Sequence, residues 1–126
     1  MNYLLDTHVF LWVLSNPDRL NAKAIKAVQD PNHTVFVSAV SAVEISIKSS
    51  LGKLKVPGNL RSEIIARGLQ ELPLHYQHGE RLSRLPMHHG DPFDRMLIAQ
   101  AMEEGLIFVT HDQKMKLYSG VKLLLT

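Results

Sequence analysis

Short apolar runs alternate with helical patterns along the chain, and this alternation limits the possible fold more than any other feature. Runs typical of buried strands lie at residues 2–5, 34–37, 72–74, 106–110 and 121–125. Apolar residues at helical spacing separate these runs, over residues 8–14, 22–29, 41–51, 60–70, 77–82 and 92–104. Gly52 and Gly105 follow two of the helical segments, where glycine commonly ends a helix. The alternation predicts an α/β domain with a mostly parallel, roughly five-stranded sheet.

Length and composition set wider limits. A chain of 126 residues predicts a single domain over residues 1–126. The absence of cysteine excludes disulfides, thiol nucleophiles and cysteine-based zinc sites. A net charge of +2 permits a nucleic-acid partner without indicating one. No apolar run approaches the ~18 residues of a membrane span, and no secretory signal is visible. We therefore expect a cytoplasmic protein that does not use a membrane.

Four carboxylates stand where packing alone does not place an acid. Asp6 closes the first apolar run, and Asp112 follows the run at residues 106–110. Glu44 and Asp94 interrupt the apolar stripes of two expected helices. Parallel sheets bind ligands beyond the carboxyl ends of their strands, so these acids are expected to converge there. An acidic cluster of this kind predicts a site for a divalent metal ion.

Helix capping is the alternative explanation for three of these acids. Asp6 and Asp112 each precede an expected helical segment and are suited to cap it. Asp91 is a good N-cap for the helix over residues 92–104, with Asp94 as its capping-box partner. Both explanations stay open for these residues at this level.

Glu44 has no capping role, because it lies within its helix. Val40, Glu44, Ile47 and Leu51 follow helical spacing, which places Glu44 on or beside the expected buried face. The alternative to a metal ligand is a buried ion pair, with Arg95 as the expected partner.

Four segments together resemble the PIN-domain ribonucleases, and within them the VapC-type toxins of bacterial toxin–antitoxin pairs. The first segment is Leu4-Leu5-Asp6-Thr7-His8, and the second is Ser38-Ala-Val-Ser41-Ala-Val-Glu44-Ile with Leu51-Gly-Lys-Leu54. The third is His89-Gly-Asp-Pro-Phe-Asp94-Arg-Met-Leu-Ile-Ala-Gln100. The fourth is Val109-Thr110-His111-Asp112. The segments occur in the family's order and span essentially the whole chain. The run Asp-Pro-Phe-Asp-Arg followed by Leu-Ile-Ala-Gln is the most specific of them.

The resemblance implies a three-layer α/β/α domain and hydrolysis of RNA with Mg²⁺, for which Mn²⁺ can substitute. Carried over by position, it implies that Asp6, Glu44, Asp94 and Asp112 bind the metal, and that the Thr110 hydroxyl orients metal or water. It also implies a cognate antitoxin that covers the site, and a homodimer.

Metal-bound carboxylates suit this chemistry, since Mg²⁺ activates water and offsets negative charge on a phosphodiester in its transition state. Basic side chains near the acids would attract the phosphates, and Arg95, next to Asp94, is the strongest candidate.

Two other interpretations remain open. His8 and His111 both follow apolar strands, and two histidines can cleave RNA by acid–base catalysis without metal. A non-catalytic module, either an Mg²⁺-binding receiver or an RNA-binding domain, is the alternative from another functional class.

Overall fold

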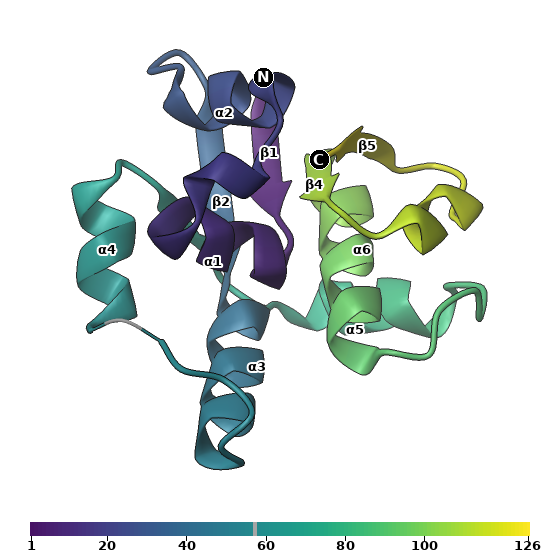
Figure 1. Cartoon of the computed structure of the whole chain (residues 1–126). Coiled ribbons are helices and arrows are strands. Elements are labelled where there is room, and N and C mark those ends of the chain that lie inside the picture. The colour runs from purple at the N-terminus through teal and green to yellow at the C-terminus, as the bar shows by residue number, and fades with distance from the viewer. Residues whose placement is uncertain (57) are drawn as a thin grey trace.

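A five-stranded parallel sheet forms the centre of the protein (Figure 1). The structure is a computed structural model that describes residues 1–56 and 58–126. All neighbouring strands are parallel, in the order β3-β2-β1-β4-β5. The strands are β1 (Asn2–Leu5), β2 (Thr34–Ser38), β3 (Gln70–Leu72), β4 (Ile107–Thr110) and β5 (Lys122–Leu125). The predicted α/β class with a mostly parallel sheet of about five strands is confirmed.

Helices connect the strands, as right-handed crossovers of parallel sheets require. They are α1 (Thr7–Ser15), α2 (Ala22–Gln29), α3 (Ala39–Ser50), α4 (Leu60–Ala66), α5 (Tyr76–Ser83) and α6 (Pro92–Glu104). Two short 3₁₀ helices, η1 (Pro17–Arg19) and η2 (Gln113–Leu117), complete the described elements. The predicted bounds of α2 and α6 agree with the structure, and Gly105 ends α6 in the left-handed conformation.

The alternation of side chains along β1 divides the core into two halves. Tyr3 and Leu5 pack with α1 and α2 on one face of the sheet. Leu4 points to the other face and packs with Leu97 and Ile98 of α6. Each half is an apolar layer between helices and sheet, so the chain forms the three-layer α/β/α arrangement that the resemblance implied.

The sequence-based bounds were wrong around β3. The strand expected at residues 72–74 is Gln70–Leu72, and the helix expected at residues 60–70 ends at Ala66. Gly68 adopts a φ of 71°, a conformation that favours glycine, and this turn ends α4. After this turn the chain runs beside β2, and Gln70 pairs with Phe36. The apolar spacing in the sequence continues through Leu69, so it gave no indication of the turn.

Among the described residues, no helix has both the length and the apolar character needed to cross a lipid bilayer.

Candidate metal centre

The carboxyl ends of the two central strands bring the first acids together. β1 pairs with β4 along its length, so Asp6 and Thr110 leave the sheet side by side. The Asp6 amide continues the ladder by donating to the Val109 carbonyl at 2.9 Å. The expected convergence of Asp6 and Asp112 at this edge follows from the pairing of β1 with β4, which brings Asp6 and Thr110 together across 104 residues of sequence.

A chain of hydrogen bonds links Asp6 to Asp112 through Thr110. The Thr110 hydroxyl donates to Asp6 Oδ2 at 2.7 Å and accepts from the Asp112 amide at 3.1 Å. Thr110 is fully buried, and Asp6 is only 2% exposed. The hydroxyl therefore fixes the orientation of the Asp6 carboxylate and the position of the Asp112 backbone.

Asp6 and Asp112 also cap helices, as the alternative explanation predicted. The His8 amide donates to Asp6 Oδ1 at 2.9 Å, and the Lys114 amide donates to Asp112 Oδ1 at 2.9 Å. In both residues the cap engages one carboxylate oxygen. The second oxygen is held by another side chain, so capping does not exclude a role in a cluster.

Asp94 does not form the expected capping box with Asp91. Asp91 caps α6 by accepting from the amides of Phe93 and Asp94. A capping box also needs the Asp94 side chain to accept from the Asp91 amide, but that amide donates to His89 Nδ1 at 3.1 Å. The Asp94 carboxylate is therefore free to turn toward Asp112.

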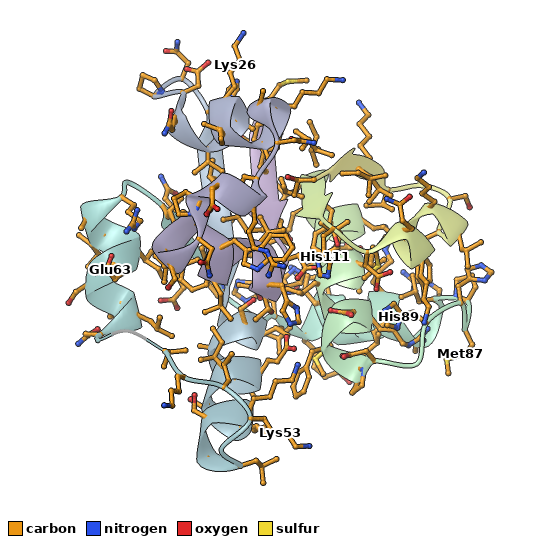
Figure 2. All side chains as sticks on the ribbon, in the orientation of Figure 1. Lys26, Lys53, Glu63, Met87, His89 and His111 are labelled. Atoms are coloured by element: carbon orange, nitrogen blue, oxygen red, sulfur yellow. The ribbon has the colours of Figure 1, made fainter. Side chains whose placement is uncertain are left out.

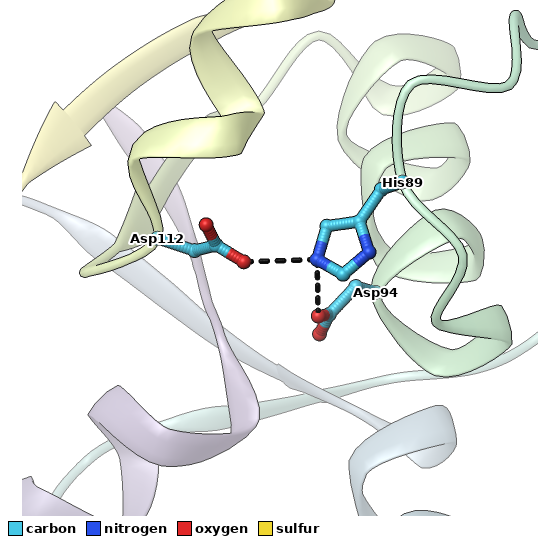
Figure 3. Close-up of side chains that lie close together, drawn as sticks. All are labelled: His89, Asp94 and Asp112. Carbon is cyan, nitrogen blue, oxygen red and sulfur yellow. Dashed lines mark hydrogen bonds and ion pairs between the residues drawn. The ribbon is translucent and has the colours of Figure 1, made fainter.

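His89 lies between the carboxylates of Asp94 and Asp112 (Figure 3). Its Nε2 is 2.8 Å from Asp112 Oδ2 and 3.1 Å from Asp94 Oδ2. Because Nδ1 accepts from the Asp91 amide, the ring proton belongs on Nε2, where it donates toward the acids. The imidazole N–H thus occupies a position between two carboxylates, where a cation is expected to bind.

The sequence pattern did not single out His89. Its one signal is its place in the His-Gly-Asp-Pro-Phe-Asp run before α6. Nothing local indicates that the ring reaches Asp112, which is 23 residues away. His89, Asp94 and Asp112 have potential ligand atoms within 4.8 Å of one another.

Crowding of negative charge changes the protonation of the cluster. Burial raises the pKa of Asp94 to about 8, with further contributions from the charges of Asp6, Asp91, Glu44 and Asp112. Burial also favours the neutral form of Asp112, but hydrogen bonds from the Lys114 amide and His89 outweigh it. They hold the pKa of Asp112 below its ordinary value. The metal-free cluster therefore disfavours the charged form of Asp94.

Glu44 joins the cluster from α3 and is 1% exposed. One of its oxygens, Oε2, accepts from the Lys48 ammonium one helical turn later. The other, Oε1, is buried and has no hydrogen-bond partner among the described residues. A buried carboxylate oxygen without a partner is unfavourable, and a metal ion or its bound water would satisfy it.

The expected stripe on α3 was wrong, although Glu44 is buried. Ile47 and Leu51 are 45% and 62% exposed, whereas Ser41 and Ile45 are buried with Glu44. Figure 1 shows why: the second half of α3 extends past the carboxyl end of the sheet, away from the other helices. Glu44 is buried because the first half of α3 packs against α1 and α6.

Arg95 does not pair with Glu44. Its guanidinium donates to the carbonyls of Pro86 and Leu85 and to the Tyr118 hydroxyl. The expected ion pair with Glu44 is wrong, because Lys48 takes that place. Two of these contacts hold the loop between α5 and α6, which carries His89, and the third joins Arg95 to Tyr118 after η2. Phosphate binding by Arg95 stays a prediction.

His8 and His111 do meet, as the metal-free interpretation required. Their ring centroids are 5.4 Å apart, with the rings edge to face. His8 Nδ1 is also 3.9 Å from Asp6 Oδ1. The two histidines therefore border the acidic cluster.

Comparison with known proteins assigns the chain to a family. The chain is 28% identical over 116 residues to Ribonuclease VapC22 of Mycobacterium tuberculosis (strain ATCC 25618 / H37Rv), covering 90% of this chain and 88% of that protein. Its fold is similar to VapBC2 from Rickettsia felis bound to a promoter DNA fragment, with a TM-score of 0.76 at 16% identity, covering 99% and 98% of the two chains.

VapBC-1 from nontypeable Haemophilus influenzae is similar as well, with a TM-score of 0.71 at 17% identity and the same coverage. At these identities the structures show a shared fold. The family model described as the PIN domain matches residues 3–121, and the chain therefore belongs to the PIN domain family.

Proposed function

We propose that this protein is a metal-dependent ribonuclease that hydrolyses RNA phosphodiester bonds as the toxin of a toxin–antitoxin pair. The observation that carries the proposal is the crowding of carboxylates at the carboxyl end of the sheet. Four carboxylates from separate segments surround a site where the pKa of Asp94 is raised to about 8. A PIN domain with a relative called a ribonuclease supports the RNA substrate.

The residues present fit a hard divalent cation. Carboxylate oxygens are the ligands that Mg²⁺ and Mn²⁺ prefer, and the unpartnered Glu44 Oε1 is available to a cation or its water. In the proposal, Asp6, Glu44, Asp94 and Asp112 hold Mg²⁺, for which Mn²⁺ can substitute. When bound, such an ion lowers the pKa of its water and offsets negative charge developing on the phosphate.

Neighbouring side chains keep the carboxylates in place. Thr110 directs Asp6 by its hydroxyl, and Lys48 holds one oxygen of Glu44 and leaves the other free. The hydrogen bond to Glu44 raises the pKa of Lys48 against the effect of burial, so this lysine stays charged. The His89 N–H stabilises Asp94 and Asp112 when both face each other without a cation.

The proposal extends to partners. Structural relatives are VapBC toxin–antitoxin complexes, which supports a small antitoxin as a partner of this chain. We further propose a homodimer and a cytoplasmic location, on the resemblance to VapC-type toxins. A Mg²⁺-binding receiver module is not favoured, since the chain belongs to the PIN domain family.

Cleavage of a structured RNA, such as tRNA, tests the proposal. Activity with Mg²⁺ or Mn²⁺ that disappears in EDTA is the expected result. Full activity in EDTA would instead support acid–base catalysis by His8 and His111, whose rings lie in contact distance. Inactivity on many RNAs with either metal contradicts the ribonuclease function itself.

A further inference from the structure

Four side chains form a continuous row beside the acidic cluster. Neither helix capping nor metal binding explains why they lie together. The His111 ring lies between two others, 5.4 Å from the His8 centroid and 4.9 Å from the Trp12 centroid. The Arg19 guanidinium carbon lies 5.0 Å from the centroid of the Trp12 ring. We call these four residues, His8, His111, Trp12 and Arg19, the aromatic row.

The aromatic row is built from two distant parts of the sequence. His8 and Trp12 stand one turn apart on α1, and Arg19 ends η1. His111 comes from the loop after β4, and Figure 2 shows it beside α1 near the middle of the molecule. Pairing of β1 with β4 brings the two parts together, so the row and the acids share one structural origin.

Three of the four side chains of the row are exposed to solvent. His8 is 50% exposed, and His111 and Arg19 are also exposed. Trp12 is half-buried, because it also contacts the core. Exposed aromatic rings with an arginine are the features with which proteins bind single-stranded nucleic acid, since every base has a π face. The row thus has the chemistry of a base-stacking surface.

The row is also directly attached to the acids. The His8 amide donates to Asp6 Oδ1 at 2.9 Å, and His8 Nδ1 is 3.9 Å from the same carboxylate oxygen. His111 lies between Thr110 and Asp112 in the chain. A nucleotide with its phosphate at the acids can place its base against these rings, because a single ribose joins base and phosphate.

We propose that the aromatic row stacks a nucleobase adjacent to the scissile phosphate, with Arg19 attracting the strand beyond it. This inference rests on the proposed ribonuclease function and adds the part of the substrate that the acids do not recognise. Stacking accepts every base and favours purines, whose π face is larger. The row thereby selects single-stranded or locally unpaired RNA.

Trp12 gives a direct readout, because it is the chain's only tryptophan. A single-stranded oligoadenylate is titrated into the Asp94→Asn protein. According to the proposed function, this variant lacks a metal ligand and does not cleave RNA. Adenine is expected to quench Trp12 fluorescence, while an abasic oligonucleotide of equal length leaves it unchanged. Oligoadenylate that binds by anisotropy without quenching Trp12, or that does not bind, overturns the proposal.

Steady-state cleavage by the otherwise unmutated protein separates stacking from catalysis. His8→Ala and His111→Ala should raise KM by roughly 5- to 150-fold, the range for loss of base–aromatic stacking, with kcat little changed. His111→Phe should restore KM. The matched control is His33→Ala, which removes a histidine packed 5.1 Å from Tyr3, just before β2 begins at the opposite end of the sheet.

The outcomes distinguish this proposal from the one on which it rests. A fall in kcat that His111→Phe does not rescue overturns stacking and favours imidazole chemistry. Normal RNA cleavage with KM unchanged in both alanine variants rejects the row and leaves the ribonuclease intact. Quenching by adenine without cleavage by the unmutated protein keeps the row and rejects the ribonuclease.

Discussion

Neutralising Asp94 should stabilise the metal-free protein while abolishing its activity. The pKa of Asp94 is raised from 3.8 to about 8, first by burial and then by the charges of neighbouring acids. Each pKa unit corresponds to about 1.36 kcal/mol, so at pH 7 the folded state loses at most about 4 kcal/mol by keeping this group protonated. Asp94→Asn removes that cost, and the amide oxygen can still accept from His89.

The dependence on pH follows from the same shift. In the unfolded chain Asp94 loses its proton near 3.8, and in the folded protein only near pH 8. Below pH 3.8 Asp94 is protonated in both states and does not destabilise the fold. As pH rises from 3.8 toward 8, the free energy of unfolding falls, and above pH 8 the loss is constant. The difference in unfolding free energy between Asp94→Asn and the unmutated protein should grow over that window.

Thermal unfolding in EDTA and in Mn²⁺ measures both effects. A carboxylate in the first turn stabilises its helix by about 0.3–1 kcal/mol, which reduces the gain. A net gain of 1 kcal/mol or more raises Tm by at least about 3 °C in a domain of this size. Mn²⁺ at 100 times its Kd stabilises the unmutated protein by about 2.7 kcal/mol, and Asp94→Asn much less.

Asp91→Asn is the matched control, because asparagine caps a helix about as well as aspartate. It should raise Tm in EDTA less than Asp94→Asn does, because it removes only one of the neighbouring charges that raise the pKa of Asp94. It should respond to Mn²⁺ like the unmutated protein. If Asp94→Asn melts lower in EDTA and Mn²⁺ stabilises it as much as the unmutated protein, the reasoning is refuted. In that case Asp94 stabilises the start of helix α6 and does not belong to a metal-binding cluster.

Three further predictions concern the same cluster. Asp6→Asn, Glu44→Gln and Asp112→Asn should each lose most RNA cleavage while remaining folded by circular dichroism, and Asp91→Asn should keep most; an inactive Asp91→Asn contradicts the assignment. Thr110→Val leaves the Asp6 oxygen and the Asp112 amide without their buried hydrogen-bond partner. The free energy of unfolding in urea should therefore fall by about 1–3 kcal/mol, and the rate of RNA cleavage should fall as well. Unchanged stability and rate argue against the bridging role of Thr110. The antitoxin should insert an Arg or Lys side chain at the acids and weaken Mn²⁺ binding, measured by calorimetry on the complex; unaltered Mn²⁺ affinity opposes this.

Local signals in the sequence were enough for most of the architecture. The bounds of α2 and α6 depend on helical spacing and on capping residues such as Asp91 and Gly105, which act within one or two turns. Parallel pairing then followed from the alternation of strands and helices. The error at β3 arose where apolar spacing continued through the turn at Gly68. Periodicity cannot show where a chain reverses if the residues on both sides are apolar.

The candidate site divides in the same way. Asp6 and Asp112 were recognisable because each follows a buried strand, and parallel strands end at the same edge of a sheet. The partners of the acids were not identified from the sequence: Lys48 rather than Arg95 pairs with Glu44, and His89 reaches Asp112 across 23 residues. Lys48 lies one turn from Glu44 on α3, a local pair that helical spacing contains. His89 meets Asp112 only once the α5–α6 loop and the end of β4 have packed together.

The sequence by itself determined the class of fold and the positions of the acids, since both depend on short-range periodicity and on strand ends. Only the tertiary structure decided that α3 turns Ile47 and Leu51 outward, that His89 lies between two carboxylates, and that His8, His111 and Trp12 form one row. These features depend on distances between residues far apart in the chain. Such distances are set by the packing of helices against the sheet, which no local pattern of residues contains.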